Sequence, residues 1–112
     1  MDWGGEVLMD TIGLFRSMGK HVIGGGKDIA EARTPAIVER NGVKIAFVGY
    51  CSVLPDDHDA RQGKAGFAPM RAHTYYQRGG DAREEFQPGT PPRILTVPYE
   101  DDLRELQEDI RK

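Results

Sequence analysis

The chain has 112 residues, with 15 basic and 18 acidic side chains and a formal net charge of −3 at pH 7. This balance provides no basic surface for nucleic acid or for an anionic membrane. The length suits one small domain, and no apolar run approaches the roughly 20 residues that a membrane-spanning helix requires. A single cysteine excludes an internal disulfide and leaves the cellular compartment open.

The N-terminal part of the sequence predicts a helix and then a short strand. From Glu6 to Met18 the apolar residues recur with helical spacing, and Gly19 stands where helices commonly end in a left-handed conformation. His21 to Ile23 predict a short buried strand with a structural histidine, and the three glycines 24–26 predict the turn that leaves it. These glycines do not form a phosphate-binding loop, because the spacing differs and Asp28 stands where that motif has Ser or Thr.

Residues 28–50 predict a short helix and a β-hairpin. Asp28 and Glu31 have the spacing of a capping box, which favours one or two helical turns. Asn41-Gly42 is a preferred two-residue turn, and it predicts a hairpin over residues 36–50 in a register that joins opposite charges on one face. Because Ile45 to Val48 are apolar on both faces, we expect this strand to be covered on two sides.

The C-terminal half predicts a long loop, a strand and a helix. Residues 51–93 show no sustained periodicity and are rich in Gly, Pro, Asp and Arg, so we expect either a lid or a disordered insertion. Ile94 to Val97 predict a strand, and a helix with acids at its start and bases at its end follows Pro98. The order of elements predicts an α/β fold. We expect residues 1–112 to be the internal part of a single domain, incomplete at both ends.

Few side chains suggest chemistry on their own. The acidic turn, Asp56-Asp57-His58-Asp59, offers oxygen and nitrogen ligands for a divalent ion, but its place inside the loop favours a solvated turn. Cys51, His58 and His73 lack the paired spacing of zinc ligands, and Cys51 is expected to be a small core residue rather than a nucleophile. Tyr75-Tyr76, near Arg71 and Arg78, would contact an anionic ligand or partner, or else pin the loop to the domain, which we favour.

Several separated positions together resemble one family. They are the stretch Met1 to Gly4, four small residues and the hairpin that ends in Gly49-Tyr50. The small residues are Gly24, Gly26, Ala30 and Ala32. In this arrangement the chain resembles the CapA/PgsA type of capsule (poly-γ-glutamate) synthesis proteins, which are relatives of the calcineurin-like metallophosphatases. The resemblance covers Met1 to about Ser52, and Leu95 to Lys112 as the helix ahead of the next core strand.

The resemblance implies a partial layered α/β sandwich of the metallophosphoesterase type, with divalent metal ions in the intact parent. The family's Asn-His ligand pair would fall just before Met1 and its later histidines after Lys112. We therefore expect no catalytic residue, no metal ligand and no cofactor in this chain. Asp2 and Trp3 would support a ligand loop, and four residues would lie at the rim of the site: Gly49, Tyr50, Cys51 and Ser52.

Two functions follow as hypotheses. In the first, a metal-activated water of the intact parent attacks a phosphoester or related bond, and this chain is inactive alone. Its partners would be the remainder of the parent domain and an anionic polymer or phosphoester substrate, without nucleic acid and without a membrane segment. In the second, the chain is a non-enzymatic binding or scaffold module that uses the loop over 51–93, with Tyr75, Tyr76 and Arg78 as its contact surface.

Overall fold

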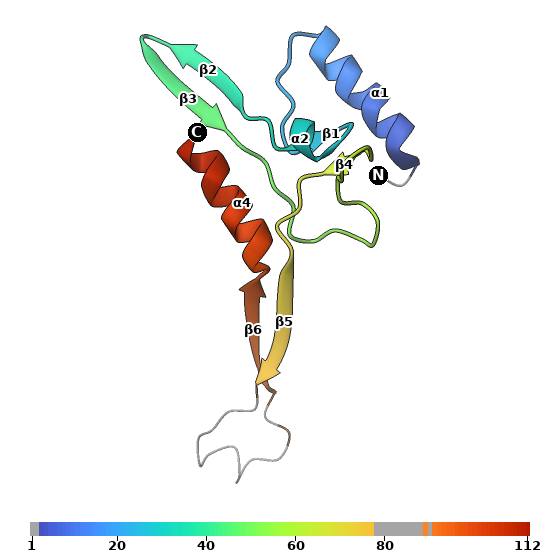
Figure 1. Ribbon diagram of the computed structural model, residues 1–112, viewed down its shortest axis with the longest axis vertical. Coiled ribbons are helices and arrows are strands. Elements are labelled where there is room, and N and C mark those ends of the chain that lie inside the picture. The colour runs from blue at the N-terminus through green and yellow to red at the C-terminus, as the bar shows by residue number, and fades with distance from the viewer. Residues whose placement is uncertain (1–2, 78–88, 90) are drawn as a thin grey trace.

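The computed structural model describes residues 3–77, 89 and 91–112, which form helices and small antiparallel sheets (Figure 1). The elements in chain order are α1 (Gly4–Ser17), β1 (Gly25–Gly26), α2 (Ile29–Ala32), β2 (Ala36–Arg40), β3 (Val43–Phe47), β4 (Gly66–Phe67), β5 (Ala72–Gln77), β6 (Arg93–Pro98) and α4 (Glu100–Arg111). The strands pair as β1–β4, β2–β3 and β5–β6. The chain is therefore a mixed α/β protein, as the order of elements predicts.

Helix α1 confirms the first prediction and ends as the sequence indicates. Gly19 has a φ of +70°, the left-handed conformation that a glycine adopts without steric cost. Its N–H donates to the Arg16 carbonyl (2.9 Å), and the N–H of Lys20 donates to that of Phe15 (3.0 Å). These bonds satisfy carbonyl groups that the helix end would otherwise leave unpaired.

The prediction for residues 21–26 is wrong. His21 to Ile23 form no strand, and His21 is exposed rather than a buried structural histidine. The strand lies one step later, where Gly25 and Gly26 are buried and pair with β4. The neighbouring backbone leaves no room for a side chain at Gly26, where a Cβ would lie 2.6 Å from the backbone nitrogen of Ala32.

The predicted short helix is present as α2. Asp28 is its N-cap and accepts a hydrogen bond from the N–H of Glu31 (2.9 Å). The Glu31 carboxylate accepts from the N–H of Lys27 (2.8 Å), one residue before the partner that a capping box usually has. Both donors at the start of the helix are thereby satisfied, and the pKa of Glu31 is lowered by its bond from the Lys27 backbone and by Arg16.

The β2–β3 hairpin has the predicted register, with Arg40 opposite Val43 and Glu39 opposite Lys44. Asn41 and Gly42 both have positive φ, as a type I′ turn requires. The expected cover on two sides is not provided by the described residues, since every residue of β3 is exposed. One face of the hairpin leaves four large apolar side chains uncovered, with exposed fractions of 36–58%: Val38, Val43, Ile45 and Phe47.

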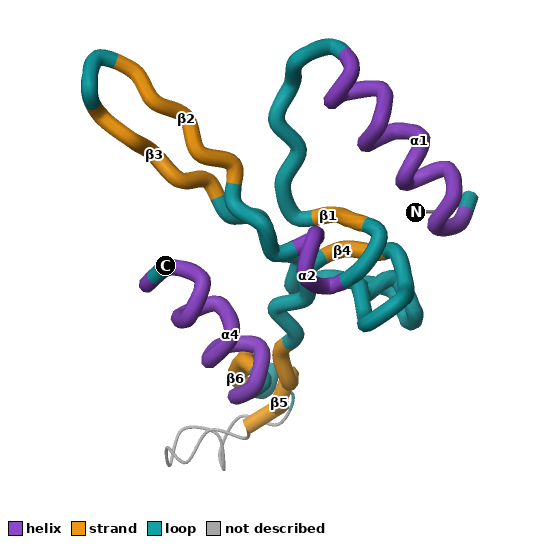
Figure 2. The backbone as a smooth tube through the Cα atoms, turned by 45° about the horizontal axis from the view of Figure 1, so that its top comes forward, coloured by secondary structure: helices purple, strands orange, loops and turns teal. Residues whose placement is uncertain are grey.

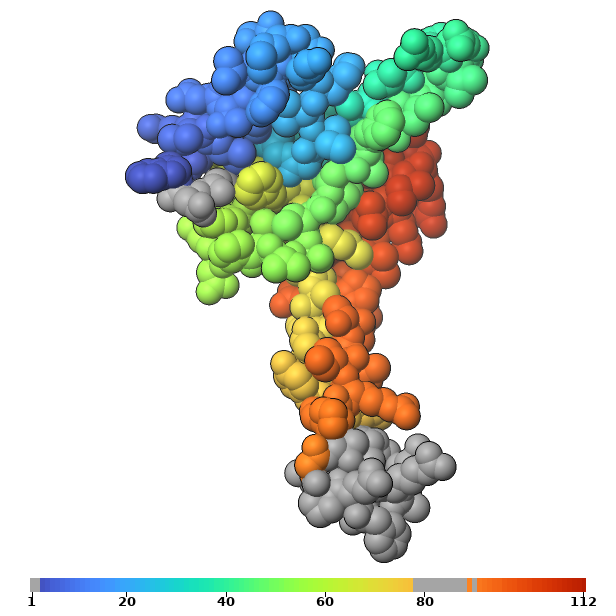
Figure 3. Space-filling view, turned by 180° about the vertical axis from the view of Figure 1, so that it is seen from behind, coloured from blue at the N-terminus to red at the C-terminus, as the bar shows by residue number. Residues whose placement is uncertain are grey.

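The loop predicted over residues 51–93 contains ordered strands. The prediction is wrong for residues 72–77, which form β5 and pair with the correctly predicted β6. No alternation marked β5 in the sequence because both of its faces carry apolar or aromatic residues. Strands β5 and β6 form a narrow ribbon that extends away from the rest of the molecule (Figure 3). Tyr75 and Tyr76 are 53% and 70% exposed on it, so they do not pin the segment to the domain.

The buried core of the described residues is small. Three alanines form its cluster, Ala32, Ala60 and Ala68, with Ile29 and Tyr50 packed against them. Helix α1 lies on one side of α2, β1 and β4, whereas the β2–β3 hairpin and α4 lie on the other side (Figure 2). The radius of gyration is 19.1 Å, compared with about 13 Å for a compact domain of this length. Helices that could cross a bilayer are absent from the described ranges.

Candidate functional site

The segment expected at the site rim crosses the centre of the molecule just after β3. Gly49 lies against Gly24, and a Cβ on either glycine would come within 3.1 Å of the other's backbone. Cys51 forms a parallel bridge with Pro69, donating its N–H to the Ala68 carbonyl (2.9 Å). These backbone contacts hold the segment at the small alanine core. Cys51 is half-buried and does not belong to the buried alanine cluster.

The remaining predicted site residues are dispersed. Ser52 is exposed, and Trp3 stands at the start of α1 with 85% of its surface exposed. Asp2 lies outside the described residues. Among the predicted positions that the structure describes, only Tyr50 places its side chain in a network of charged groups.

That network joins Tyr50 and Arg33 to Asp109 of α4. Arg33 donates from Nε to Oδ2 of Asp109 (2.7 Å) and from Nη2 to Oδ1 (3.0 Å), the bidentate geometry in which guanidinium and carboxylate fit best. The Tyr50 hydroxyl also donates to Asp109 Oδ2, and Lys112 Nζ lies 2.9 Å from Oδ1. Arg33 reaches Glu105 as well, through the backbone carbonyl (2.9 Å) and the carboxylate (2.9 Å).

The network shifts the pKa values of Asp109, Arg33 and Tyr50 further from neutrality. Burial opposes ionisation of Asp109, but the bonds from Arg33, Tyr50 and Lys112 together outweigh it and hold the pKa of that carboxyl well below its usual range. The bond to Asp109 raises the pKa of Arg33. Burial, and then the bond to the Asp109 carboxylate, raises the pKa of Tyr50 to about 12. Tyr50 therefore stays protonated and is suited to hold α4 in place, not to exchange protons.

A second buried carboxylate fixes the other end of α4. Asp102 is 2% exposed and accepts from the backbone N–H of Arg71 (2.7 Å) and from its Nε (2.9 Å) and Nη2 (2.7 Å). The side-chain bond from Arg71 lowers the pKa of Asp102. The Arg71 guanidinium also lies 5.1 Å from the centre of the Tyr99 ring, whose other neighbour is the stacked His73 ring at 4.0 Å.

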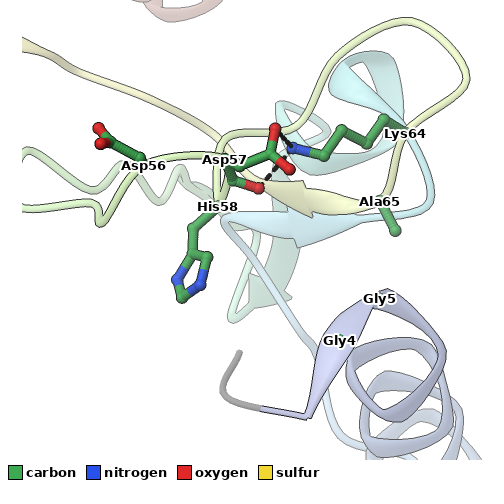
Figure 4. Close-up of a pocket in the computed structure, with 7 residues that line it drawn as sticks. All are labelled: Gly4, Gly5, Asp56, Asp57, His58, Lys64 and Ala65. Atoms are coloured by element: carbon green, nitrogen blue, oxygen red, sulfur yellow. Dashed lines mark hydrogen bonds and ion pairs between the residues drawn. The ribbon is translucent and has the colours of Figure 1, made fainter.

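The acidic turn lies beside an open hollow of about 470 Å³ between residues 56–65 and the start of α1 (Figure 4). Two of its three carboxylates, those of Asp57 and Asp59, are paired with cations of the same loop. Lys64 Nζ lies 2.7 Å from Oδ1 of Asp57, and Arg61 donates to both oxygens of Asp59 (2.9 and 3.0 Å). The bond from Lys64 lowers the pKa of Asp57, and the bonds from Arg61 lower the pKa of Asp59. Asp56 and Asp57 are exposed, which agrees with the solvated turn that the sequence favours.

These side chains do not assemble a metal site. In residues 3–77, 89 and 91–112, no three His, Cys, Asp or Glu side chains are grouped so that they could hold an ion. Figure 4 shows the side chains of Asp56 and His58 pointing away from the Asp57–Lys64 pair. The divalent metal that the family resemblance implies therefore does not fit the described residues of this chain.

The sequence reasoning missed the residues that hold α4. Asp102 and Asp109 are seven positions apart, so they lie on one face of the helix. That spacing was the available signal, but the prediction covers only acids at the start of the helix and bases at its end, and it gives Asp109 no role. Their arginine partners are 31 and 76 residues away along the chain. Only the folded arrangement brings these charges together.

Comparison with protein families gives a match over the whole of the given sequence. The family described as bacterial capsule synthesis protein PGA_cap matches residues 1–112. Comparison with curated proteins gives no match. The family match confirms the resemblance that the sequence motifs indicate, and it connects the chain to capsule synthesis. The chain belongs to the bacterial capsule synthesis protein (PGA_cap) family.

Proposed function

We propose that this chain serves capsule synthesis as the internal part of a CapA-type domain related to the metallophosphoesterases. The proposal depends chiefly on the family match, which extends over residues 1–112. The small sheets would be portions of a larger layered sandwich, and the metal ligands would come from elsewhere in the parent domain. Its substrate would be poly-γ-glutamate or another anionic polymer, or a phosphoester, and this chain would be inactive alone.

The exposed apolar faces support a larger domain. One face of the β2–β3 hairpin presents Val38, Val43, Ile45 and Phe47, and an isolated two-stranded hairpin is at best marginally stable in water. Burial of this face would contribute about 25 cal/mol per Å² of apolar surface removed from water. We propose that the remainder of the parent domain covers it.

A charge on that face tests the proposal. Because Ile45 is 50% exposed, Ile45→Lys should leave the far-ultraviolet circular dichroism of the 112-residue chain unchanged. In the encapsulated bacterium the same substitution in the gene should strongly reduce capsular polymer. Lys44→Gln, on the opposite face of β3, is the matched control and should preserve the capsule. A normal capsule with Ile45→Lys would contradict the proposed packing.

Catalytic incompleteness has its own test. We expect the purified chain to show no hydrolysis of bis(p-nitrophenyl) phosphate when Mn²⁺ or Mg²⁺ is added. The matched assay uses the whole gene product under the same conditions. Metal-dependent turnover by the 112-residue chain alone would overturn the proposal that the metal ligands lie elsewhere.

The ribbon favours a second candidate function, a binding module. Tyr75 and Tyr76 point from opposite faces of β5 and are largely exposed, and exposed aromatic side chains are common anchors of binding surfaces. Arg78, part of the same hypothesis, lies outside the described residues. If the ribbon binds capsular polymer, Tyr75→Ser with Tyr76→Ser should weaken binding measured by calorimetry, whereas Thr96→Ala should not. Absence of binding by the unaltered chain would remove this candidate.

A further inference from the structure

Helix α4 is held to the rest of the molecule mainly by ion pairs and hydrogen bonds of its carboxylates. Its buried residues are two aspartates, Asp102 at 2% and Asp109 at 8% exposure. Leu103 and Leu106 are only partly buried, and Ile110 is 67% exposed. Most helices are held by an apolar face that packs into a core. The face of α4 that meets the molecule carries carboxylates at its two ends instead.

The two carboxylates bind separate parts of the chain. Asp102, at the start of α4, binds Arg71 beside the base of the β5–β6 ribbon. Asp109, at the end of the helix, binds Arg33 after α2 and Tyr50 after β3. Helix α4 therefore connects the ribbon to the small core, as its position in Figure 1 makes visible.

Attachment of this kind adds little net stability. Removing charges from water costs several kcal/mol per ion, and their attraction offsets this cost only while every partner stays in place. Arg71 keeps 47% of its side chain exposed, so added salt can screen its pair with Asp102. Arg33 and Asp109 are more buried, at 17% and 4%, and that pair is the stronger anchor. Local opening with a low free energy is expected of a segment that has few apolar contacts.

We propose that α4, residues 100–111, is a charge-held strap that opens as a unit and uncovers Arg33 and Tyr50. The closed strap occupies both donors with its own Asp109 carboxylate. Opening needs neither the β2–β3 hairpin nor α1 to unfold, because the bonds that fix α4 do not involve them. The device would make access to Arg33 and Tyr50 depend on the ionic surroundings.

Hydrogen exchange followed by mass spectrometry tests the strap in the full chain. Raising NaCl from 0.05 to 1 M should speed amide exchange in residues 100–111 by at least roughly tenfold, while α1 stays protected. The double variant Asp102→Asn with Asp109→Asn should show this fast exchange already at low salt. Glu108→Gln, an exposed acid on the same helix, is the matched control and should behave as the unaltered chain.

Chemical labelling gives an independent measurement. Nitration of Tyr50 by tetranitromethane, followed at the peptide level, should rise with salt in parallel with α4 exchange. Equal exchange in α4 at both salt concentrations would overturn the proposal. A parallel loss of protection in α1 would also overturn it, since that result describes unfolding of the whole molecule. So would an α4 that is unprotected even at low salt in the unaltered chain.

Discussion

Replacement of Gly26 by alanine tests the close approach of β1 and α2. A Cβ at this position would lie 2.6 Å from the backbone nitrogen of Ala32 and 2.7 Å from the Cβ of Glu31. An ordinary contact begins at 3.4 Å, so α2 would have to move by roughly 0.8 Å. Because the nearest atom belongs to the backbone, no rotation of a side chain can relieve the clash.

The magnitude follows from two contributions. Overpacking of a close contact costs typically about 1–3 kcal/mol. The required movement also stretches the bond from the Glu31 N–H to Asp28, now 2.9 Å, and loss of an N-cap costs about 1 kcal/mol. We expect Gly26→Ala to lower the free energy of unfolding by about 3 kcal/mol, a large share of the stability of a small domain.

Urea unfolding followed by circular dichroism measures this loss. Trp3 fluorescence is a poor probe because that side chain is already 85% exposed. The matched control is Gly13→Ala inside α1, where an added Cβ meets no atom within 4 Å and better helix propensity should raise stability by up to about 1 kcal/mol. If Gly26→Ala were as stable as the unaltered chain within about 0.5 kcal/mol, the close-packing argument would be refuted.

Three further predictions concern α4 and the hairpin. Absorbance at 295 nm should show the Tyr50 phenol ionising near pH 12, and Asp109→Asn should move that step toward the ordinary value of about 10; an unmoved step would exclude Asp109 as a cause. Because the folded pKa values of Asp102 and Asp109 are lowered, their stabilisation of α4 is complete above about pH 5 and is lost as pH falls below about 4. Exchange of α4 amides, compared with intrinsic rates at each pH, should reveal this loss, and constant protection down to pH 2 would contradict it. Gly42→Val should destabilise the hairpin by roughly 1–2 kcal/mol, because φ is +77° there, and unchanged hairpin amide exchange would argue against this reasoning.

Local signals account for the parts of the fold that the sequence predicts well. The hairpin register depends on the turn Asn41-Gly42 and on residues directly beside it, so all of its determinants are close together in the sequence. The end of α1 at Gly19 and the cap of α2 at Asp28 are local in the same sense. Each of these features is encoded within a few residues, and each is present in the structure.

The features that the sequence does not predict depend on contacts between residues that are far apart in the chain. A three-residue apolar run at 21–23 carries no periodicity, and its burial depends on a partner strand that the described chain does not place beside it. Strand β5 is defined mainly by its pairing with β6, about 20 residues later. The partner of Tyr50 could not be anticipated because Asp109 lies 59 residues further along the chain. Tertiary contacts therefore determine the structure at residues 21–23, in β5 and around Tyr50.

The separation between Arg33 and Asp109 also bears on the order in which the molecule assembles. A hairpin with a two-residue turn closes within microseconds, whereas bonds between residues 76 positions apart require a long loop to close. During synthesis Arg33 and Tyr50 leave the ribosome well before Asp109 exists. Attachment of α4 is therefore expected to be a late folding event, which completes a framework that the hairpin and α2 have already formed.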